Sequence, residues 1–160
     1  MISSTIYNFN LSFRQFVSAI TPAVFSKPKS KNIVSQPENL KGGKFLIIDN
    51  DPFSCFIAGR NIENLQGRVQ IAESVHDALL MIKHEDYNAI LVDIKLTGLQ
   101  PETHQQFNNV PLIALTAVKS EEVRLALIRA GIADWIDKDV SPENLLQKLA
   151  RFIPPQPTDY

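Results

Sequence analysis

Four apolar runs of the sequence end in residues that can bind ions or act on phosphate. These residues are the triplet Asp49-Asn50-Asp51, then Asp93, Thr116 and Lys138. Carboxylates are the ligands that a hard divalent cation prefers, and a lysine ammonium binds anions as a compact point charge. If they lie together, these acids, the hydroxyl and the lysine form a site at which a cation and an ammonium receive an anion.

The segments around these residues alternate between two patterns. Short apolar runs rich in β-branched residues predict strands buried on both faces of a parallel sheet, and 3.6-residue periodicity predicts the intervening helices. The predicted strands are 44–49, 67–74, 88–94, 110–117 and 133–138, and the predicted helices are 52–65, 75–87, 120–130 and 141–153. This alternation specifies a doubly wound α/β fold with a five-stranded parallel sheet.

Capping residues mark where the helices begin. The expected N-caps are Asp51, Ser74, Ser120 and Ser141. The expected inner face of the first helix consists of Phe53, Phe56, Ile57 and Leu65. Between the third and fourth strands, the stretch KLTGLQPETHQQFNN has little apolar face and contains Gly98 and Pro101. We therefore expect the third helix to be short or replaced by a loop.

In an open parallel sheet, ligands bind outside the carboxyl ends of the strands. Asp49, Asp93, Thr116 and Lys138 end four of the five predicted strands, so they are expected at one edge. Each has an ordinary explanation on its own, as a turn cap, a surface acid or a solvated lysine. The combination is far more specific than any member.

Residues 44 to 154 resemble the response-regulator receiver domain of two-component signalling. The resemblance rests on LIIDND (46–51), ILVDIKLTG (90–98), LIALTA (112–117) and AGIADWIDKD (130–139). It implies a flavodoxin-like, doubly wound fold, in agreement with the pattern of strands and helices. The rest of the chain is interpreted as a basic, Ser-rich leader or linker (1–43) and a C-terminal tail (155–160).

The resemblance also implies a role for each matching residue. Asp93 matches the aspartate that accepts a phosphoryl group from a phosphohistidine with the help of Mg²⁺, Asp49 the first acid of the metal-binding pair, and Lys138 the phosphate-binding lysine. Thr116 matches the switch hydroxyl and Trp135 the switch aromatic. The donor would be a histidine kinase or a histidine phosphotransfer protein. The chemistry would be phosphoryl acceptance and slow hydrolysis, which is closer to a switch than to an enzyme.

Four positions depart from the family's pattern, and one of them is Thr97, which stands where the family usually has a proline after the Asp93 motif. The second acid of the metal-binding pair is Asn50, which removes one charge and is expected to weaken Mg²⁺ binding while leaving an amide oxygen as a ligand. Lys95 stands where the family offers a backbone carbonyl to the metal, and its side chain could pair with Asp49 or Asp93. Asp139 replaces the usual proline after the strand-five lysine, which removes the usual reason for a cis peptide there.

These departures leave two main hypotheses. In the first, Asp93 is phosphorylated and the face of the fourth strand, fourth helix and fifth strand changes its affinity for a downstream protein. In the second, the chain is a degenerate receiver that keeps the fold and works as a phosphorylation-independent binding module, with Lys95 and Lys138 locking the acids. An unrelated function of a small flavodoxin-like domain is a third, more general alternative.

The overall composition narrows the class of protein and its expected location. The net charge of −1 gives no general affinity for nucleic acid, and 44% hydrophobic residues suit a soluble domain with a real core. The lone Cys55 cannot form a disulfide framework, which favours a cytoplasmic location. No apolar run approaches the roughly 20 residues of a membrane span.

The leader differs in charge from the rest of the chain. It carries five bases and one acid, against 11 bases and 16 acids in residues 44–160. Its apolar residues at helical spacing are Phe13, Phe16, Val17, Ile20 and Val24, interrupted by Pro22. Three interpretations stay open: a loose tail, an amphipathic segment for a membrane surface or a partner, and a transit peptide. Because no output domain follows residue 154 in this sequence, signalling is expected to pass through a partner, the leader or onward phosphate transfer.

Overall fold

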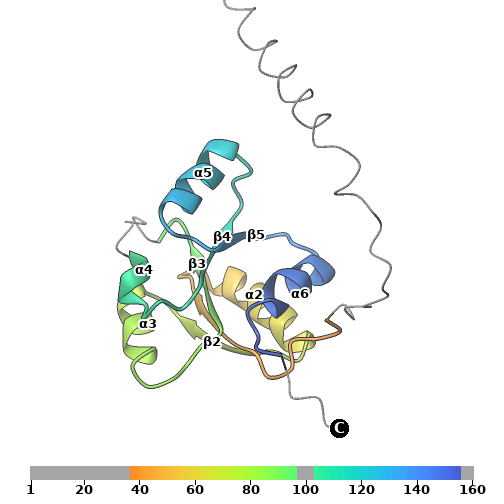
Figure 1. Cartoon of the computed structure of the whole chain (residues 1–160). Helices are drawn as coiled ribbons and strands as arrows, with labels where there is room; N and C mark the ends of the chain where they lie inside the picture. Colours follow the sequence, from red (N-terminus) through yellow and green to blue (C-terminus); the bar gives the residue numbers. More distant parts are fainter. Residues whose placement is uncertain (1–36, 97–102, 156–160) are drawn as a thin grey trace, which may run out of the picture. The chain divides into compact units, whose positions relative to one another are not determined.

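The computed structural model describes residues 37–96 and 103–155, without the side chains of 103 and 104 (Figure 1). Its elements are β1 (Lys44–Ile48), α2 (Pro52–Asn64), β2 (Arg68–Ala72), α3 (Val75–Met81), β3 (Ala89–Asp93), α4 (Thr103–Gln106), β4 (Leu112–Thr116), α5 (Glu121–Arg129), β5 (Asp134–Asp137) and α6 (Pro142–Ala150). The expectations for the leader fall almost entirely outside the described residues and stay predictions.

The five strands form one parallel sheet in the order β2-β1-β3-β4-β5, as the predicted doubly wound fold requires. Every residue of β3 and β4 is buried, which explains why these strands are uninterrupted apolar runs. The winding reverses between β1 and β3, and the carboxyl ends of these two strands therefore border the crevice in which such sheets bind ligands.

Two hydrophobic cores cover the two faces of the sheet. The first includes buried residues of α2 and α6, and the second includes buried residues of α3 and α5. Leu40, which the sequence pattern placed in the leader, is fully buried in the first core, and its N–H donates to the carbonyl of Leu65 at 2.6 Å. The packed domain therefore extends back at least to Leu40.

The predicted inner face of α2 is wrong at three of its four residues, whereas the fourth, Leu65, is partly buried and packs against the first core. Phe53 and Phe56 are 72% and 60% exposed, and Ile57 is also exposed, whereas Cys55, Gly59 and Ile62 are the buried residues of this helix. The apolar residues of α2 almost surround its first two turns, so periodicity alone did not select a side. Cys55, Gly59 and Ile62 follow each other at helical spacing and form the side of α2 that faces the sheet.

The expected helix starts are confirmed at four positions. Asp51, Ser74 and Ser141 accept a backbone N–H with their side chains, and Ser120 is the N-cap of α5 without such a bond. Gly131 has a φ of 81°, a conformation that favours glycine and ends α5. The predicted short third helix is α4, four residues long. Within 37–96 and 103–155, no helix has the length and apolarity to cross a membrane.

Candidate functional site

Two buried carboxylates lie at the carboxyl edge of the sheet. Asp93 is the last residue of β3, and Asp49 follows directly on β1. Their exposed fractions are 5% and 1%, which is unusual for acids because a buried charge is costly unless it is paired. Adjacent parallel strands bring them together, as the sequence predicted.

Lys138 joins the two acids. Its Nζ donates to Oδ2 of Asp49 and to Oδ2 of Asp93, each at 2.8 Å. The backbone N–H of Lys138 donates to the carbonyl of Thr116 at 3.1 Å, which ties the loop after β5 to the end of β4. The predicted convergence of these side chains is therefore confirmed, and one ammonium is shared between two carboxylates.

The other oxygen of each acid is held by the backbone. Oδ1 of Asp49 accepts the N–H of Asp51 at 2.9 Å, and Oδ1 of Asp93 accepts the N–H of Lys95 at 2.9 Å. Both bonds reach two residues along the chain, so each strand ends in a tight turn closed by its own acid. The carboxylates are oriented before any ligand binds.

These contacts shift two pKa values in opposite directions. Burial on its own raises the pKa of Asp49, but hydrogen bonds from Lys138, Ser54 and the backbone of Asp51 outweigh it and hold the pKa below its ordinary value. Burial likewise lowers the pKa of Lys138, but its bonds to the two acids outweigh that effect and raise the pKa. The charged forms of Asp49 and Lys138 are therefore favoured at neutral pH.

Asn50 and Lys95 lie at the exposed rim of the site. The expected pairing of Lys95 with an acid is wrong for the described residues, because the ammonium that contacts both carboxylates belongs to Lys138. Asp51 is also exposed, and its side chain accepts the N–H of Phe53 at 3.0 Å, which confirms it as a helix cap. No cis peptide occurs within 37–96 and 103–155, so the peptide before Asp139 is trans.

The predicted switch residues lie next to this cluster. Thr116 is buried, and its hydroxyl oxygen accepts the N–H of Val118 at 2.9 Å. Trp135 is half-buried on β5, with the guanidinium of Arg124 5.1 Å and the ammonium of Lys148 5.3 Å from its ring centroid. Cations over an indole ring attract it electrostatically, so these two side chains hold Trp135 between α5 and α6.

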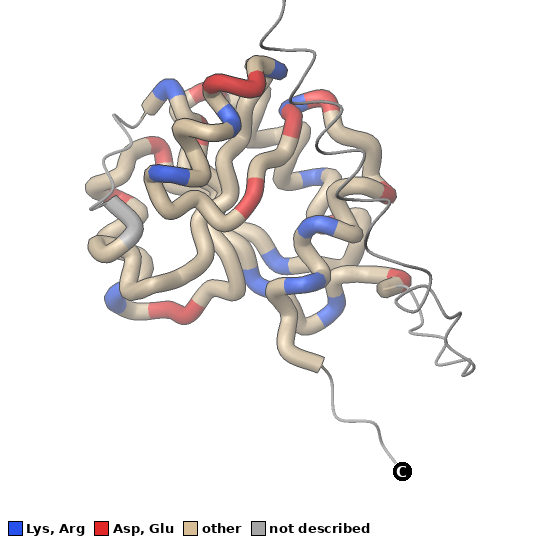
Figure 2. Tube along the Cα trace, turned by 45° about the horizontal axis from the view of Figure 1, so that its top comes forward, with Lys and Arg blue, Asp and Glu red and all other residues tan. Residues whose placement is uncertain are grey.

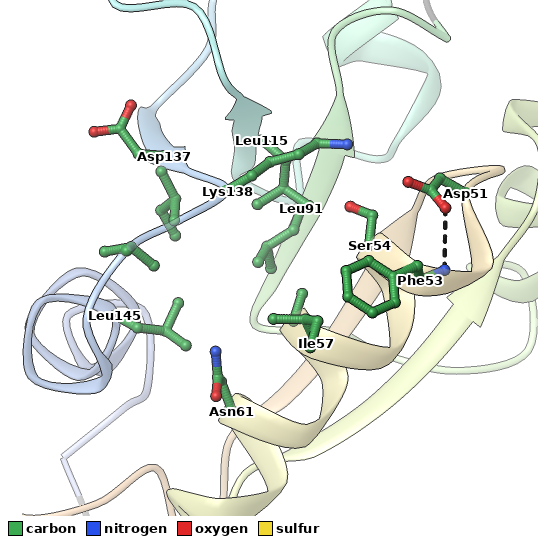
Figure 3. Close-up of a pocket in the computed structure, with 13 residues that line it drawn as sticks. Asp51, Phe53, Ser54, Ile57, Asn61, Leu91, Leu115, Asp137, Lys138 and Leu145 are labelled. Carbon is green, nitrogen blue, oxygen red and sulfur yellow. Dashed lines mark hydrogen bonds between the residues drawn. The ribbon is translucent and has the colours of Figure 1, made fainter.

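A pocket opens beside the site, between α2 and the segment from β5 into α6 (Figure 3). Figure 3 shows the Lys138 side chain extending over one end of it, toward the side on which Ser54 and Asp51 lie. Ser54, which was not among the predicted site residues, lines this pocket and helps to hold the pKa of Asp49 below its ordinary value. Its position in the first turn of the helix after Asp49 was an available signal, because that turn faces the ligand edge.

The donor set fits Mg²⁺ in part. Asp49 and Asp93 contact one ammonium and so lie within reach of one ion, and Mg²⁺ binds oxygen ligands while keeping several waters. The exposed amide of Asn50 is a third candidate donor. Among the residues with described side chains, no group of three acids, histidines or cysteines could hold a metal. The arrangement therefore suits a weakly bound ion.

The chain's acids and bases are interspersed along the described trace (Figure 2), so the charge of the site comes from specific side chains rather than from a broad field. The parallel five-stranded sheet, with two acids and a lysine at the edge where the winding reverses, defines a flavodoxin-like α/β domain with a charged site at its ligand edge. The family model described as the response regulator receiver domain matches residues 45–150. The chain belongs to this family and is a receiver domain of two-component signalling.

Its curated relatives include much longer proteins. Sensor histidine kinase GacS of Pseudomonas protegens is 22% identical over 131 residues, which are 74% of this chain and 14% of that protein. Signal transduction histidine-protein kinase BarA of Escherichia coli is 26% identical over 118 residues, 68% of this chain and 13% of the kinase. The chain thus spans about a seventh of the length of these kinases.

Two solved structures are similar to this chain over the receiver domain. The receiver domain of sensor histidine kinase PA1611 from Pseudomonas aeruginosa, which holds a magnesium ion in its active site cleft, is 25% identical with a TM-score of 0.59, covering 70% of this chain and 98% of that one. A CheY-like receiver domain protein from Methanospirillum hungatei is 27% identical with a TM-score of 0.59, covering 69% and 93%.

Proposed function

We propose that Asp93 accepts a phosphoryl group from the phosphohistidine of a histidine kinase or a histidine phosphotransfer protein. The observation that carries the proposal is the pair of buried acids joined by one lysine, Nζ to Oδ2 at 2.8 Å on each side. A carboxylate oxygen of Asp93 forms the new bond to phosphorus while the bond from phosphorus to the histidine nitrogen breaks. That nitrogen keeps the electron pair and takes up a proton.

Lys138 and Asp49 have separate tasks in this step. Transfer to a carboxylate requires neutralisation of the charge on both reacting groups. Lys138 already contacts Asp93 and can follow the transferred oxygens, while Asp49 keeps the ammonium charged and in place. Mg²⁺ would be held by Asp49, Asp93, the Asn50 amide and the Lys95 carbonyl, and would supply further charge neutralisation. Asn50 makes that site weaker than one with three carboxylates.

The response to phosphorylation is proposed to run through Thr116. Its hydroxyl now accepts the N–H of Val118, and turning it toward a phosphoryl oxygen would break that bond and move the start of the loop before α5. Trp135 lies between α5 and α6 and would repack with this loop. The face of β4, α5 and β5, which exposes Leu125 and Ile128, is the proposed binding surface for a downstream protein.

The direct test is intact-mass measurement after incubation with acetyl phosphate and Mg²⁺. We expect wild type to gain about 80 Da, the mass of one phosphoryl group, and Asp93→Asn to gain nothing. Asp51→Asn is the matched control, because Asp51 is two residues from Asp49, caps α2 and lies outside the reacting pair. Equal labelling of Asp93→Asn and wild type would overturn the assignment of Asp93.

The alternative is a degenerate receiver that binds its partner without phosphorylation. It follows from Asn50 and from the ammonium that already occupies both acids. Absence of a mass gain in wild type, combined with partner binding that is unchanged in Asp93→Asn, would favour it. The cytoplasmic location stays a prediction, motivated by the free, buried Cys55.

A further inference from the structure

The open edge of the sheet at β2 has an unusual combination of exposed groups. Among the described residues, β2 pairs only with β1. The N–H of Arg68 and the C=O of Ala72 form hydrogen bonds on the β1 side, at 2.9 and 3.2 Å. Because backbone groups alternate in direction along a strand, the N–H and C=O of Val69 and Ile71 point outward, to the open edge.

Apolar side chains accompany these outward-facing backbone groups. Ile71 is 45% exposed, and Phe56 of α2 is 60% exposed. Both line the same two neighbouring hollows, so they lie side by side along the edge. Natural proteins protect edge strands with charges, proline or bulges, yet the only charged residue of β2 is Arg68 at its start.

We propose that this edge pairs with β2 of a second copy of the chain, in antiparallel direction and with the two-fold axis at Gln70. In this register Val69 lies opposite Ile71 of the second copy, and the two residues exchange both of their outward hydrogen bonds. Val69 and Ile71 lie on the same side of β2 as Phe56, so the apolar side chains of the two copies also meet.

Charge complementarity selects the antiparallel direction. Arg68 begins β2, and Arg60 lines the hollow at that end, where it also pairs with Glu63 at 3.3 Å. Glu73 lies beyond the other end of the strand and lines the second hollow. Antiparallel pairing brings Glu73 of each copy to the end that carries Arg60 and Arg68 of the other. Parallel pairing would bring like-charged ends together.

The predicted dimer is weak. A five-residue strand and one phenylalanine per copy bury less than the roughly 1,200–2,000 Å² of a standard stable interface. We therefore expect a reversible dimer with a dissociation constant on the order of 100 µM. The interface does not contain Asp93 or Lys138. Evidence against the dimer would therefore leave the proposal that Asp93 accepts a phosphoryl group unchanged.

The test is sedimentation velocity of the full chain over a concentration series that passes through this range. Ile71→Lys places a charge on the open edge and is expected to weaken the dimer at least tenfold. Leu80→Lys introduces the same charge at a leucine of α3 that is also 45% exposed and lies outside the paired strand, and is expected to leave the dimer unchanged. A monomer at every concentration, or equal loss in both variants, would overturn the proposal.

A pair of cysteine variants tests the register. Gln70→Cys would face its own copy at a Cα separation of about 4.5 Å, within reach of a disulfide, while Arg68→Cys would lie about 14 Å from its copy. The native Cys55 is buried and common to both variants. Under mild oxidation we expect a covalent dimer from Gln70→Cys alone. Equal cross-linking of the two variants, or preferential cross-linking of Arg68→Cys, would contradict this register.

Discussion

Buried acids lie in a charged cluster at each end of β5, and the two clusters have opposite ratios of acids to bases. At the carboxyl end, Asp49 and Asp93 share the single base Lys138. At the amino end, the single acid Asp134 is shared by Lys148 at 2.7 Å and Arg151 at 3.3 Å. Asp134 is 7% exposed, so burial is similar and the ratio of acids to bases is the difference.

This difference separates a site from a structural clamp. Two acids with one base keep an excess of negative charge that a cation can neutralise, and the cluster lies at the edge where ligands bind. One acid with two bases has no such excess, and its role is to hold α6 against the start of β5. Buried charge by itself therefore does not single out a candidate site, whereas an excess of negative charge at the ligand edge does.

The largest expected effect is that of Lys138→Met. It leaves two buried acids without a counterion, and we expect the free energy of unfolding to fall by about 3 kcal/mol. Lys148→Met, the same change at the amino end, leaves Arg151 on Asp134 and is expected to cost about 0.5 kcal/mol. Urea unfolding at neutral pH measures both. Equal losses would show that the two clusters do not differ in the way proposed.

Removal of an acid is expected to lower the free energy of unfolding by a smaller amount. Here the larger loss is expected at the amino end of β5, whereas removal of a lysine has its larger effect at the carboxyl end. Asp134→Asn removes the acid that Lys148 and Arg151 share and is expected to destabilise by about 2 kcal/mol. Asp49→Asn leaves Lys138 paired with Asp93, so a loss of about 1 kcal/mol is expected. The same unfolding measurement compares them, and a larger loss in Asp49→Asn would contradict the shared-base interpretation.

Addition of an acid at the carboxyl-end cluster is expected to strengthen its binding of Mg²⁺. Asn50→Asp gives the carboxyl end a third carboxylate and is expected to raise Mg²⁺ affinity about tenfold, or about 1.4 kcal/mol. Asn64→Asp adds the same charge at the last residue of α2 and serves as the control. Titration followed by the fluorescence of Trp135, the only tryptophan, is the readout. An equal gain in both variants would indicate a general charge effect.

The smallest expected effect is on the way the free energy of unfolding changes with pH. The pKa of Asp49 lies below its ordinary 3.8 in the folded state, so its pairing stabilises the fold above about pH 4 and is lost as pH falls through the lowered value. The pKa of Lys138 is raised above 10.5, so its contribution is present below 10.5 and is lost as pH rises through the folded-state value. The stability difference between wild type and Asp49→Asn should therefore be constant near neutrality and narrow in acid. A difference that does not change down to about pH 2 would contradict it.

Much of the fold was predictable because its signals are local. Apolar runs and capping residues indicated all five strands and the starts of α2, α3, α5 and α6, and the weak apolar face after β3 indicated a short α4. The side of α2 that faces the sheet was not predictable. Apolar residues nearly surround its first turns, and only the packed structure shows that the side with Cys55, Gly59 and Ile62 faces the sheet.

The sequence by itself determined which residues end the strands, since a strand and its last polar residue are set by neighbours in the chain. Parallel pairing then implied a common edge for Asp49 and Asp93. The sequence placed both Lys138 and Lys95 near this edge, and only the tertiary structure decided that Lys138 and not Lys95 contacts the two acids. Which lysine contacts the acids depends on the direction and length of each side chain in the folded sheet. The spacing of residues along the sequence does not give this information.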